Sequence, residues 1–376
     1  MKILITGANG FIGKNLRTHL IERKDVEVVC FTSENDIEQL ALLLSGVTLI
    51  YHLAGVNRSA DPNDFFLYNE ELTRLLCCQV VIAANRTNTP PATIVYASST
   101  QAANSSPYGQ SKRGAELILL AASEDHGIPV NIFRLPNVFG KWCQPNYNSF
   151  VATFCHNIAR GLPIKIDNGE ASVKLIFIED LINQFIDQLD ALPSYSDLYN
   201  FRFISQEYTC TVGEIARLIE SFKRSRITSE VERVGAGFIG ALYSTYISYL
   251  PVESFSYPVH PYDDARGMFV EILKTPDCGQ FSFFTAFPGV TRGGHYHHTK
   301  TEKFLVIRGQ ARFRFRHIQT GEKYELLSSG AALEIVETIP GWTHDITNIG
   351  VEELFVMLWA NEVFDRSKPD TFNCPV

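Results

Sequence analysis

Short apolar runs alternate with helical patterns along the first part of the chain. The apolar runs, typical of buried strands, lie at 2–6, 26–31, 47–55, 92–99 and 129–137. The helical patterns lie at 11–24, 69–86, 109–125 and 211–225. This alternation predicts βαβ units and therefore an α/β fold with a parallel, doubly wound sheet.

The pattern changes after about residue 245. The segment 248–264 is rich in Pro, Ser and Tyr, which is typical of a linker or an extended entry strand. Strand-like runs follow at 268–274, 279–287, 302–317, 322–329, 331–338 and 352–360. Because no helical period is sustained there, we expect an all-β barrel or jelly roll. With 376 residues, the chain is predicted to form two domains, 1–245 and 246–376.

Net charge and the cysteine pattern limit which binding partners and which cellular compartment we expect for this protein. A formal net charge of −8 argues against nucleic acid or an anionic membrane as the main partner. No apolar run approaches the roughly 18–20 residues that span a bilayer, and the N-terminal residues lack a signal-peptide pattern. The eight cysteines form no CxxC pair. We therefore expect reduced thiols and a cytoplasmic protein.

A glycine motif, "TGANGFIG", follows the first predicted strand. Gly7, Gly10 and Gly13 lie where a strand turns into a helix, in the spacing G-x-x-G-x-x-G. Glycine permits the tight turn and lets backbone N–H groups approach a pyrophosphate at the helix N-terminus. The strand–turn–helix context makes this a candidate dinucleotide site.

A second motif, "YASST…YGQSK", contains Ser99, Tyr108 and Lys112. Tyrosine and lysine four residues apart share one face of a helix. A nearby ammonium group favours the phenolate, so Tyr108 is a candidate for proton transfer near neutral pH. The hydroxyl of Ser99, at a strand end, is a candidate hydrogen-bond donor to a substrate oxygen.

Residues 1 to about 245 resemble an extended short-chain dehydrogenase/reductase. The matching pieces are "TGANGFIG", "YHLAG" (51–55), Asn69, the serines at 98–99, "YGQSK", "FRLPNVFG" (133–140) and "FIEDL" (177–181). The resemblance implies a Rossmann-type sheet, with Tyr108 as acid/base, Lys112 holding the nicotinamide ribose and lowering the tyrosine pKa, and Ser99 orienting the carbonyl. It implies cofactor contacts from Gly7, Asn9, Gly10, Phe11, Ile12, Gly13, Thr32, Ser33, Leu53, Ala54, Gly55, Lys112 and Leu135.

Two departures from that family narrow the chemistry. Sugar-nucleotide 4,6-dehydratases carry an Asp-Glu pair where this chain has Thr100-Gln101, so dehydration lacks its acid and base. The strand at 26–31 is followed by Thr32-Ser33 and lacks the acidic residue that binds a ribose 2′-hydroxyl. Hydroxyl groups tolerate a 2′-phosphate, which favours NADPH. The first domain is therefore interpreted as a reductase.

A histidine cluster marks the second domain. In "GVTRGGHYHHTKTEKFLVIRG", His295 and His297 are two residues apart and face the same side of a strand. Glu302 follows a turn, and "PGWTHDITN" adds His344 from a distant strand. Three imidazoles and one carboxylate suit a divalent metal such as zinc, nickel, iron or manganese, with positions open for substrate.

These motifs resemble a cupin, a small jelly-roll barrel, over residues from about 250 to 376. The run "RGMFVE" before "RGGHYH" also resembles cupin epimerases of nucleotide 4-keto-6-deoxysugars, which are typically metal-free. That difference leaves open whether His295 is a ligand or a base. Other candidate proton carriers are His298, Lys300 and Lys303, and either the metal or Arg292 is expected to polarise the keto oxygen.

Over essentially its whole length, the chain resembles bifunctional enzymes of capsule and O-antigen synthesis. The resemblance implies C3 epimerisation of a UDP-2-acetamido-2,6-dideoxy-4-hexulose by the cupin. Reduction of C4 with NADPH then gives UDP-N-acetyl-L-pneumosamine (UDP-2-acetamido-2,6-dideoxy-L-talose), on the route to UDP-N-acetyl-L-fucosamine. The resemblance also implies zinc and a homodimer formed through the cupin. The alternatives are a simple 4-ketoreductase with a structural, dimerising or sugar-binding cupin, a nucleotide-sensing binding protein, and a metal-dependent oxygenase.

Overall fold

The chain forms two compact units. The computed structural model describes residues 1–190, 199–259, 261–264, 267–270, 272–273, 275, 279–362 and 367–376. The first unit comprises Met1–Val138 and Lys174–Thr209, and the second comprises Phe139–Val173 and Cys210–Val376. The second unit thus contains helices α6 (Phe150–Ala159), α8 (Val212–Thr228) and α9 (Gly237–Ser248) together with the C-terminal strands. The domain boundary at 245/246 stays a prediction.

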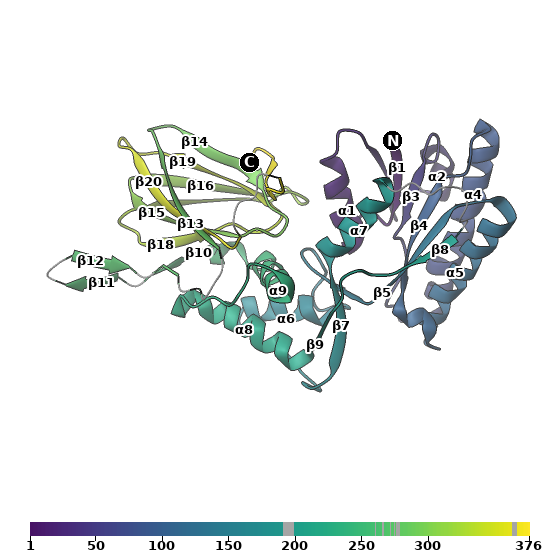
Figure 1. Ribbon diagram of the computed structural model, residues 1–376, viewed down its shortest axis with the longest axis horizontal. Coiled ribbons are helices and arrows are strands. Elements are labelled where there is room, and N and C mark those ends of the chain that lie inside the picture. Colours follow the sequence, from purple (N-terminus) through teal and green to yellow (C-terminus); the bar gives the residue numbers. More distant parts are fainter. Residues whose placement is uncertain are drawn as a thin grey trace. The chain divides into compact units, whose positions relative to one another are not determined.

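The first unit contains a parallel sheet of six strands in the order β2-β1-β3-β4-β5-β8. The strands are β1 (Lys2–Thr6), β2 (Glu27–Phe31), β3 (Leu49–His52), β4 (Thr93–Ser99), β5 (Val130–Leu135) and β8 (Tyr199–Arg202). Helices α1 (Phe11–Ile21) and α7 (Ile178–Asp190) cover one face, and α2 (Ile37–Leu43), α4 (Leu72–Thr87) and α5 (Pro107–His126) cover the other (Figure 1). The predicted doubly wound sheet is confirmed.

The core of this unit follows from the apolar runs in the sequence. Strands β3 and β4 are buried along their whole length, as expected for strands covered on both faces. Their apolar side chains pack with those of α4 and α5 in one cluster that includes Ile50, Ile94, Leu76 and Leu119. The sheet therefore holds the carboxyl ends of β1, β3 and β4 at one edge, which is where parallel sheets bind ligands.

The second unit contains two antiparallel sheets of five strands each. One has the order β10-β18-β15-β20-β13 and the other β17-β16-β19-β14-β21. The strands are β10 (Ser256–Pro258), β13 (Gln280–Ala286), β14 (Thr291–Tyr296), β15 (Glu302–Arg308), β16 (Gln310–His317), β17 (Lys323–Ser329), β18 (Glu334–Glu337), β19 (Trp342–Asn348), β20 (Leu354–Ala360) and β21 (Phe372–Asn373). The prediction of β structure is confirmed for the C-terminal part of the chain, which follows the helices of this unit.

Several smaller elements complete the two units. A hairpin is formed by β11 (Pro261–Asp264) and β12 (Gly267–Val270), and a small sheet by β6 (Asn137–Phe139), β7 (Ser172–Phe177) and β9 (Tyr208–Thr211). Short helices are α3 (Pro62–Phe65), the π-helix η1 (Phe66–Glu71), and the 3-10 helices η2 (Thr100–Ala103) and η3 (Val252–Ser254). Part of the predicted strand 268–274 lies outside the described residues. In the described part of the chain, no helix is long and apolar enough to cross a bilayer.

A buried ion cluster joins helix α8 to the sheet that contains β15 and β18. Glu337 accepts hydrogen bonds from both Arg226, near the end of α8, and Lys303, on β15. The hydroxyl of Tyr257 accepts from Lys303 Nζ at 2.9 Å, and the Arg226 guanidinium lies 4.2 Å from the Tyr257 ring centre. Because burial alone would disfavour both charges, the carboxylate is what keeps the two cations in place.

Replacing Glu337 by Gln removes the anion between two cations, one of them fully buried. We expect the free energy of unfolding to fall on the order of 3–5 kcal/mol, because an uncompensated buried charge remains. Urea denaturation measures this. The matched control is Glu352→Gln, whose exposed ion pair with Arg308 is expected to contribute less than about 1 kcal/mol. Equal losses in the two variants would contradict a stabilising role for the cluster.

Candidate functional site

The glycine motif forms a tight turn between β1 and α1. Gly7 has φ +69 and donates its N–H to the Phe31 carbonyl at 2.8 Å, while the Gly10 N–H bonds the Gly7 carbonyl at 2.9 Å. A Cβ on Gly7 would lie 2.7 Å from the Ala54 nitrogen, and one on Gly13 would lie 2.2 Å from the Gly7 oxygen. Only glycine fits at these two positions, and the N-terminus of α1 is left open to an anion.

Ser99, Tyr108 and Lys112 come together at the carboxyl end of β4. Ser99 is the last residue of β4, and Tyr108 and Lys112 share one face of α5. The Lys112 Nζ donates to the Ala97 carbonyl at 2.9 Å and lies 4.8 Å from the ring centre of Tyr96. Ser99 and Tyr108 line the same pocket, and the Ser99 Oγ accepts the Gln101 N–H at 3.1 Å.

Burial shifts both titrating groups toward their neutral forms. It lowers the pKa of Lys112 to about 8, although Glu116 one turn further along α5 opposes this shift. Burial also raises the pKa of Tyr108, and the hydrogen bond with Ser99 opposes the rise. That Lys112 lowers the tyrosine pKa stays a prediction, and the Lys112 Nζ is meanwhile held by the Ala97 carbonyl and the Tyr96 ring. Tyr108 is a neutral phenol, ready to donate a proton.

A pocket of about 150 Å³ opens beside these three side chains. Of the predicted cofactor residues, it is lined by Ile12, Leu53, Gly55, Lys112 and Leu135, in addition to Ser99 and Tyr108. Ala54 precedes Gly55 in the chain and donates its N–H to the Thr6 hydroxyl at 3.2 Å. Apart from Ile12, the residues of the glycine motif do not line the pocket, and among them Asn9 is exposed and Phe11 half-buried.

Thr32 and Ser33 lie apart from the pocket, directly after β2. The Thr32 N–H and hydroxyl both point to the Asn35 Oδ1, at 2.8 and 3.2 Å, and Ser33 is exposed. This is where a parallel nucleotide-binding sheet meets the ribose of the adenosine half. The two side chains offer hydroxyl groups there without a negative charge.

Two buried polar side chains, Asn69 and His52, join neighbouring elements of the first unit. Asn69 lies in the π-helix η1, accepts the Val56 N–H at 2.8 Å, and donates to the Val56 carbonyl at 3.0 Å and to the Ser111 hydroxyl at 2.9 Å. His52 bridges the hydroxyls of Thr6 and Thr73, and burial lowers its pKa to about 3. Sequence analysis missed the role of His52. A polar residue at the end of a buried strand was the available signal.

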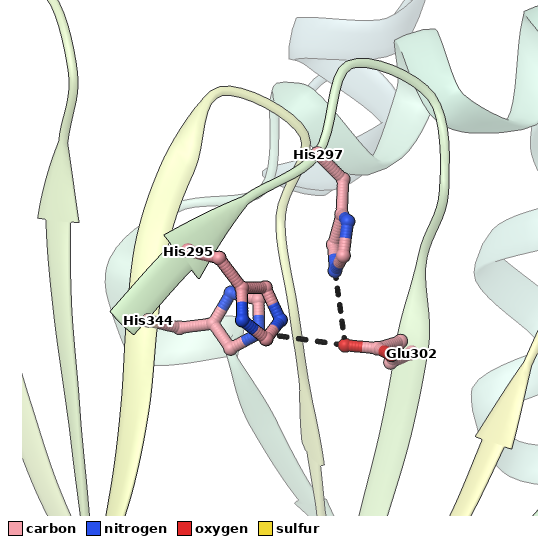
Figure 2. A group of neighbouring side chains, drawn as sticks. All are labelled: His295, His297, Glu302 and His344. Carbon is pink, nitrogen blue, oxygen red and sulfur yellow. Dashed lines mark hydrogen bonds and ion pairs between the residues drawn. The ribbon is translucent and has the colours of Figure 1, made fainter. Parts of the chain in front are cut away.

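His295, His297, Glu302 and His344 meet inside the second unit (Figure 2). One nitrogen or oxygen from each lies within 4.8 Å of those of the others. Glu302 Oε2 lies 3.1 Å from His297 Nε2 and 3.4 Å from His344 Nε2, and the rings of His295 and His344 are 4.7 Å apart between centres. His295 lies near the end of β14, His297 follows that strand, Glu302 begins β15 and His344 lies on β19.

A bulge in β14 brings the first histidine into register with the last. Gly293 pairs with Asp345, and the register then shifts so that His295 lies opposite His344. Gly293 and Gly294 have φ values of +102 and +75, and a Cβ on Gly293 would lie 2.9 Å from the His344 oxygen. The glycine pair before "HYH" is therefore what permits the bulge.

The hydrogen-bond roles within the cluster fit a cation. His297 Nδ1 lies 2.6 Å from the Asp370 carbonyl oxygen, which can only accept, so this nitrogen carries the hydrogen. His297 Nε2 then lies 3.1 Å from Glu302 Oε2. A divalent metal between these two atoms would accept an electron pair from each of them.

The pKa values of Glu302 and His295 also favour a bound cation. Burial opposes ionisation of Glu302, but its contacts with His297 and His344 outweigh that effect and hold the carboxyl pKa well below its usual range. Burial, followed by the neighbouring His344 and His297, lowers the pKa of His295 to about 3. The cluster thus combines an ionised carboxylate, Glu302, with a neutral imidazole, His295, and these are the forms in which such side chains bind metals.

Two of the candidate proton carriers are held by other side chains. His298 packs against the rings of Tyr296 and Phe372, with its Nδ1 3.3 Å from the Lys141 Nζ. Lys303 belongs to the ion cluster with Glu337 described above.

Lys300 and Arg292 are engaged by backbone groups as well. Lys300 donates to the Pro369 carbonyl at 3.1 Å and to the Thr371 hydroxyl at 2.8 Å. Arg292 donates to the Thr285 carbonyl at 3.2 Å and lies 5.0 Å from the Phe284 ring centre. The structure therefore brings the four candidate ligands together but places neither the predicted carriers nor Arg292 as free groups beside them.

Both parts of the chain match known protein families. Residues 3–196 match the NAD dependent epimerase/dehydratase family, and residues 262–372 match the polysaccharide biosynthesis C-terminal domain. The chain is 54% identical over 376 residues to the UDP-2-acetamido-2,6-beta-L-arabino-hexul-4-ose reductase of Pseudomonas aeruginosa, covering 100% of this chain and 99% of the relative.

Solved structures resemble the chain over its full length and over its first part. The capsular polysaccharide assembling protein CapF from Staphylococcus aureus matches with a TM-score of 0.64 and 38% identity, covering 100% of both chains. The UDP-glucuronic acid 4-epimerase from Bacillus cereus matches with a TM-score of 0.51 and 19% identity, covering 59% of this chain and 83% of that one. At that identity the second match concerns the fold alone.

Replacing Gly13 by Ala places a Cβ 2.2 Å from the Gly7 oxygen. We expect the free energy of unfolding to fall by about 1–3 kcal/mol and binding of the nicotinamide cofactor to weaken at least about tenfold, because the helix must move away from the loop. Fluorescence titration with NADPH and urea denaturation measure the two effects. Gly169→Ala is the control, since its Cβ would meet neighbours only at 3.9 Å. Unchanged NADPH affinity in Gly13→Ala would contradict the assignment of the loop.

Proposed function

Because this chain belongs to the NAD dependent epimerase/dehydratase family, we propose that its first unit reduces the C4 ketone of a UDP-linked 4-keto-6-deoxy amino sugar. The arrangement of Ser99, Tyr108 and Lys112 around one pocket is the observation that carries this proposal. The substrate class is supported by the 54% identical reductase, whose name specifies a UDP-2-acetamido-2,6-beta-L-arabino-hexul-4-ose. The proposed product is UDP-N-acetyl-L-pneumosamine, formed for capsule or O-antigen synthesis on the route to UDP-N-acetyl-L-fucosamine.

Three side chains carry the reduction in this proposal. Ser99 donates a hydrogen bond to the keto oxygen and orients it toward Tyr108. The phenol of Tyr108 donates its proton to that oxygen as C4 becomes an alcohol carbon, and the raised pKa of Tyr108 keeps the proton available. Lys112 holds the nicotinamide ribose, and its protonated amine supplies a positive charge at the pocket. Bound NADPH supplies the hydride.

NADPH rather than NADH is proposed as the reductant. The hydroxyl groups of Thr32 and Ser33 follow β2, where an NAD-specific enzyme carries a carboxylate for the ribose 2′-hydroxyl. The exposed Ser33 leaves room for a 2′-phosphate, which a carboxylate at that position would repel.

The second unit is proposed to be a metal cupin that epimerises C3 before the reduction. His295, His297, Glu302 and His344 would hold a divalent metal, of which zinc suits a set of three histidines and one glutamate. Such a metal polarises a substrate oxygen. A 4-keto group acidifies the neighbouring C3–H, and reduction at C4 removes that activation, so epimerisation must come first.

A homodimer formed through the second unit and a cytoplasmic location are also proposed. Strand β13 is the last strand of its sheet, so one backbone edge is unpaired within the described chain. Phe283 on this strand is 65% exposed and stacks on Phe355, and Phe287 directly after it is 70% exposed. An exposed aromatic edge strand of this kind is suited to pair with a second copy of the chain, which would cover it.

One observation favours a second candidate function. His298, Lys300 and Lys303, the proton carriers expected from the sequence, are engaged elsewhere. A second unit without a proton carrier would only bind sugar, dimerise or stabilise the chain, and the protein would be a simple NADPH-dependent 4-ketoreductase.

Proton exchange at C3 distinguishes the two candidates. We expect the C3 proton signal of a UDP-4-keto-6-deoxy-HexNAc to disappear in D2O without NADPH, because the second unit removes and returns that proton. Proton NMR measures the loss. His344→Ala is expected to abolish the exchange, whereas Tyr108→Phe retains it and lowers NADPH oxidation by about 10²–10⁴-fold.

The variants serve as controls for each other, since each alters one unit. A C3 proton that never exchanges while NADPH is still consumed would establish the simple reductase instead. An absence of NADPH oxidation with every 4-ketosugar would contradict both candidates and favour a binding protein.

The reduction is expected to depend on pH through Lys112. Its amine is protonated below its pKa of about 8 and neutral above it. With pre-epimerised substrate, kcat/KM for NADPH oxidation should therefore be constant near neutral pH and fall as the pH rises through about 8. The amine then loses the positive charge that the site uses. A profile that stays flat well above that pKa would contradict this assignment.

A further inference from the structure

We propose that Asp370 is a positioning residue for the metal site, holding the ring of His297 with its backbone carbonyl and the following loop with its carboxylate. The inference rests on the proposed metal site and concerns a residue outside the four candidate ligands. Asp370 precedes β21, in the segment 367–376.

The backbone carbonyl of Asp370 determines the tautomer of His297. It lies 2.6 Å from His297 Nδ1 and accepts the hydrogen of that nitrogen. The Nε2 lone pair is then directed toward Glu302, where the metal is proposed to lie. Metal-binding histidines generally donate their second nitrogen in this way, which orients the ring and makes it a better ligand.

The carboxylate of Asp370 holds the loop that connects His297 to Glu302. Oδ1 accepts the His298 N–H at 3.0 Å, and Oδ2 accepts the N–H groups of Thr299 and Lys300 at 2.9 and 2.8 Å. Oδ2 also accepts the Thr299 hydroxyl at 3.1 Å. Three successive N–H groups directed at one anion form a backbone nest, which binds a carboxylate more strongly than it binds a neutral amide.

The backbone around Asp370 is secured from both sides. Asp370 itself has φ +37, a conformation that Asp and Asn adopt more readily than other side chains. Beyond it, β21 pairs with β14, so that Asn373 lies opposite His295, and the Cys374 N–H donates to the Gly294 carbonyl at 2.8 Å. Before it, the Pro369 carbonyl accepts from Lys300 Nζ at 3.1 Å.

These contacts link two proposed ligands through one segment. The carboxylate fixes the loop after His297, the carbonyl fixes the ring of His297, and β21 lies beside His295. Weakening the carboxylate contacts should let the carbonyl move and the His297 ring turn. The metal would then lose affinity and change its ligand geometry, although the rest of the fold is kept.

The test compares Asp370→Asn with Asp345→Asn in the full-length protein. The Asp370→Asn substitution keeps the size of the side chain and tolerates the same φ, but removes the charge that three N–H groups share. We expect zinc binding, measured by competition with a chelator, to weaken about 10- to 100-fold. We also expect the visible absorption of the cobalt(II)-loaded protein to change, because it reports ligand geometry.

Asp345→Asn is the control for a loss of stability alone. Asp345 is buried next to His344 and accepts hydrogen bonds from Arg314 at 2.9 and 2.6 Å. Its loss should lower the free energy of unfolding without changing the cobalt spectrum. NADPH binding, which belongs to the first unit, should be unchanged in both variants.

The outcomes separate this inference from the proposed metal site. If wild type binds one zinc ion that His344→Ala abolishes, but Asp370→Asn has wild-type affinity and spectrum, Asp370 has no positioning role. Equal effects of Asp370→Asn and Asp345→Asn would likewise overturn it, since stability alone would explain them. If wild type binds no zinc, the proposed metal site itself fails.

Discussion

One electrostatic constraint governs the second unit: an ionised carboxylate, Glu302, is held in a buried place among imidazoles. Removing a charge from water is costly unless an opposite charge replaces the solvent. The Asp370 carbonyl accepts the hydrogen of His297 Nδ1, so the Nε2 of that ring is the nitrogen that faces Glu302. A divalent cation would satisfy the carboxylate and the imidazole lone pairs together. The bulge at Gly293, the register of β19 and the segment around Asp370 all serve to bring these four side chains to one point.

In both units a backbone carbonyl, rather than a side chain, holds a group essential to the proposed chemistry. The Ala97 carbonyl accepts from Lys112, and the Asp370 carbonyl accepts from His297. A backbone carbonyl in or next to a strand is held rigidly by the sheet. It also does not titrate, so its role as an acceptor does not change with pH. Burial then sets the pKa values around it, lowering that of Lys112 and raising that of Tyr108. The first unit thus presents a neutral acid beside a readily deprotonated amine, and the second presents an anion prepared for a cation.

The parallel sheet and the antiparallel C-terminal strands were predictable from the sequence, because each depends on short-range spacing. The contacts of the supporting residues were not. Asn69 lies in a π-helix that replaces the start of the predicted helix 69–86, and its partners Val56 and Ser111 come from other elements. Asp370 has no motif around it. Helix α9 was also not predicted, because it is largely buried and its sequence lacks a polar face.

The sequence by itself determined which groups of the sites could be neighbours. A four-residue spacing places Tyr108 and Lys112 on one helical face, and a two-residue spacing places His295 and His297 on one side of a strand, because backbone geometry sets both periods. Only the tertiary structure decided what surrounds them. It brought Glu302 and His344 together from separate strands, lowered rather than kept the pKa of Lys112, and assigned Lys303 to an ion cluster with Glu337. Those outcomes depend on burial and on partners distant in the chain, which no local pattern encodes.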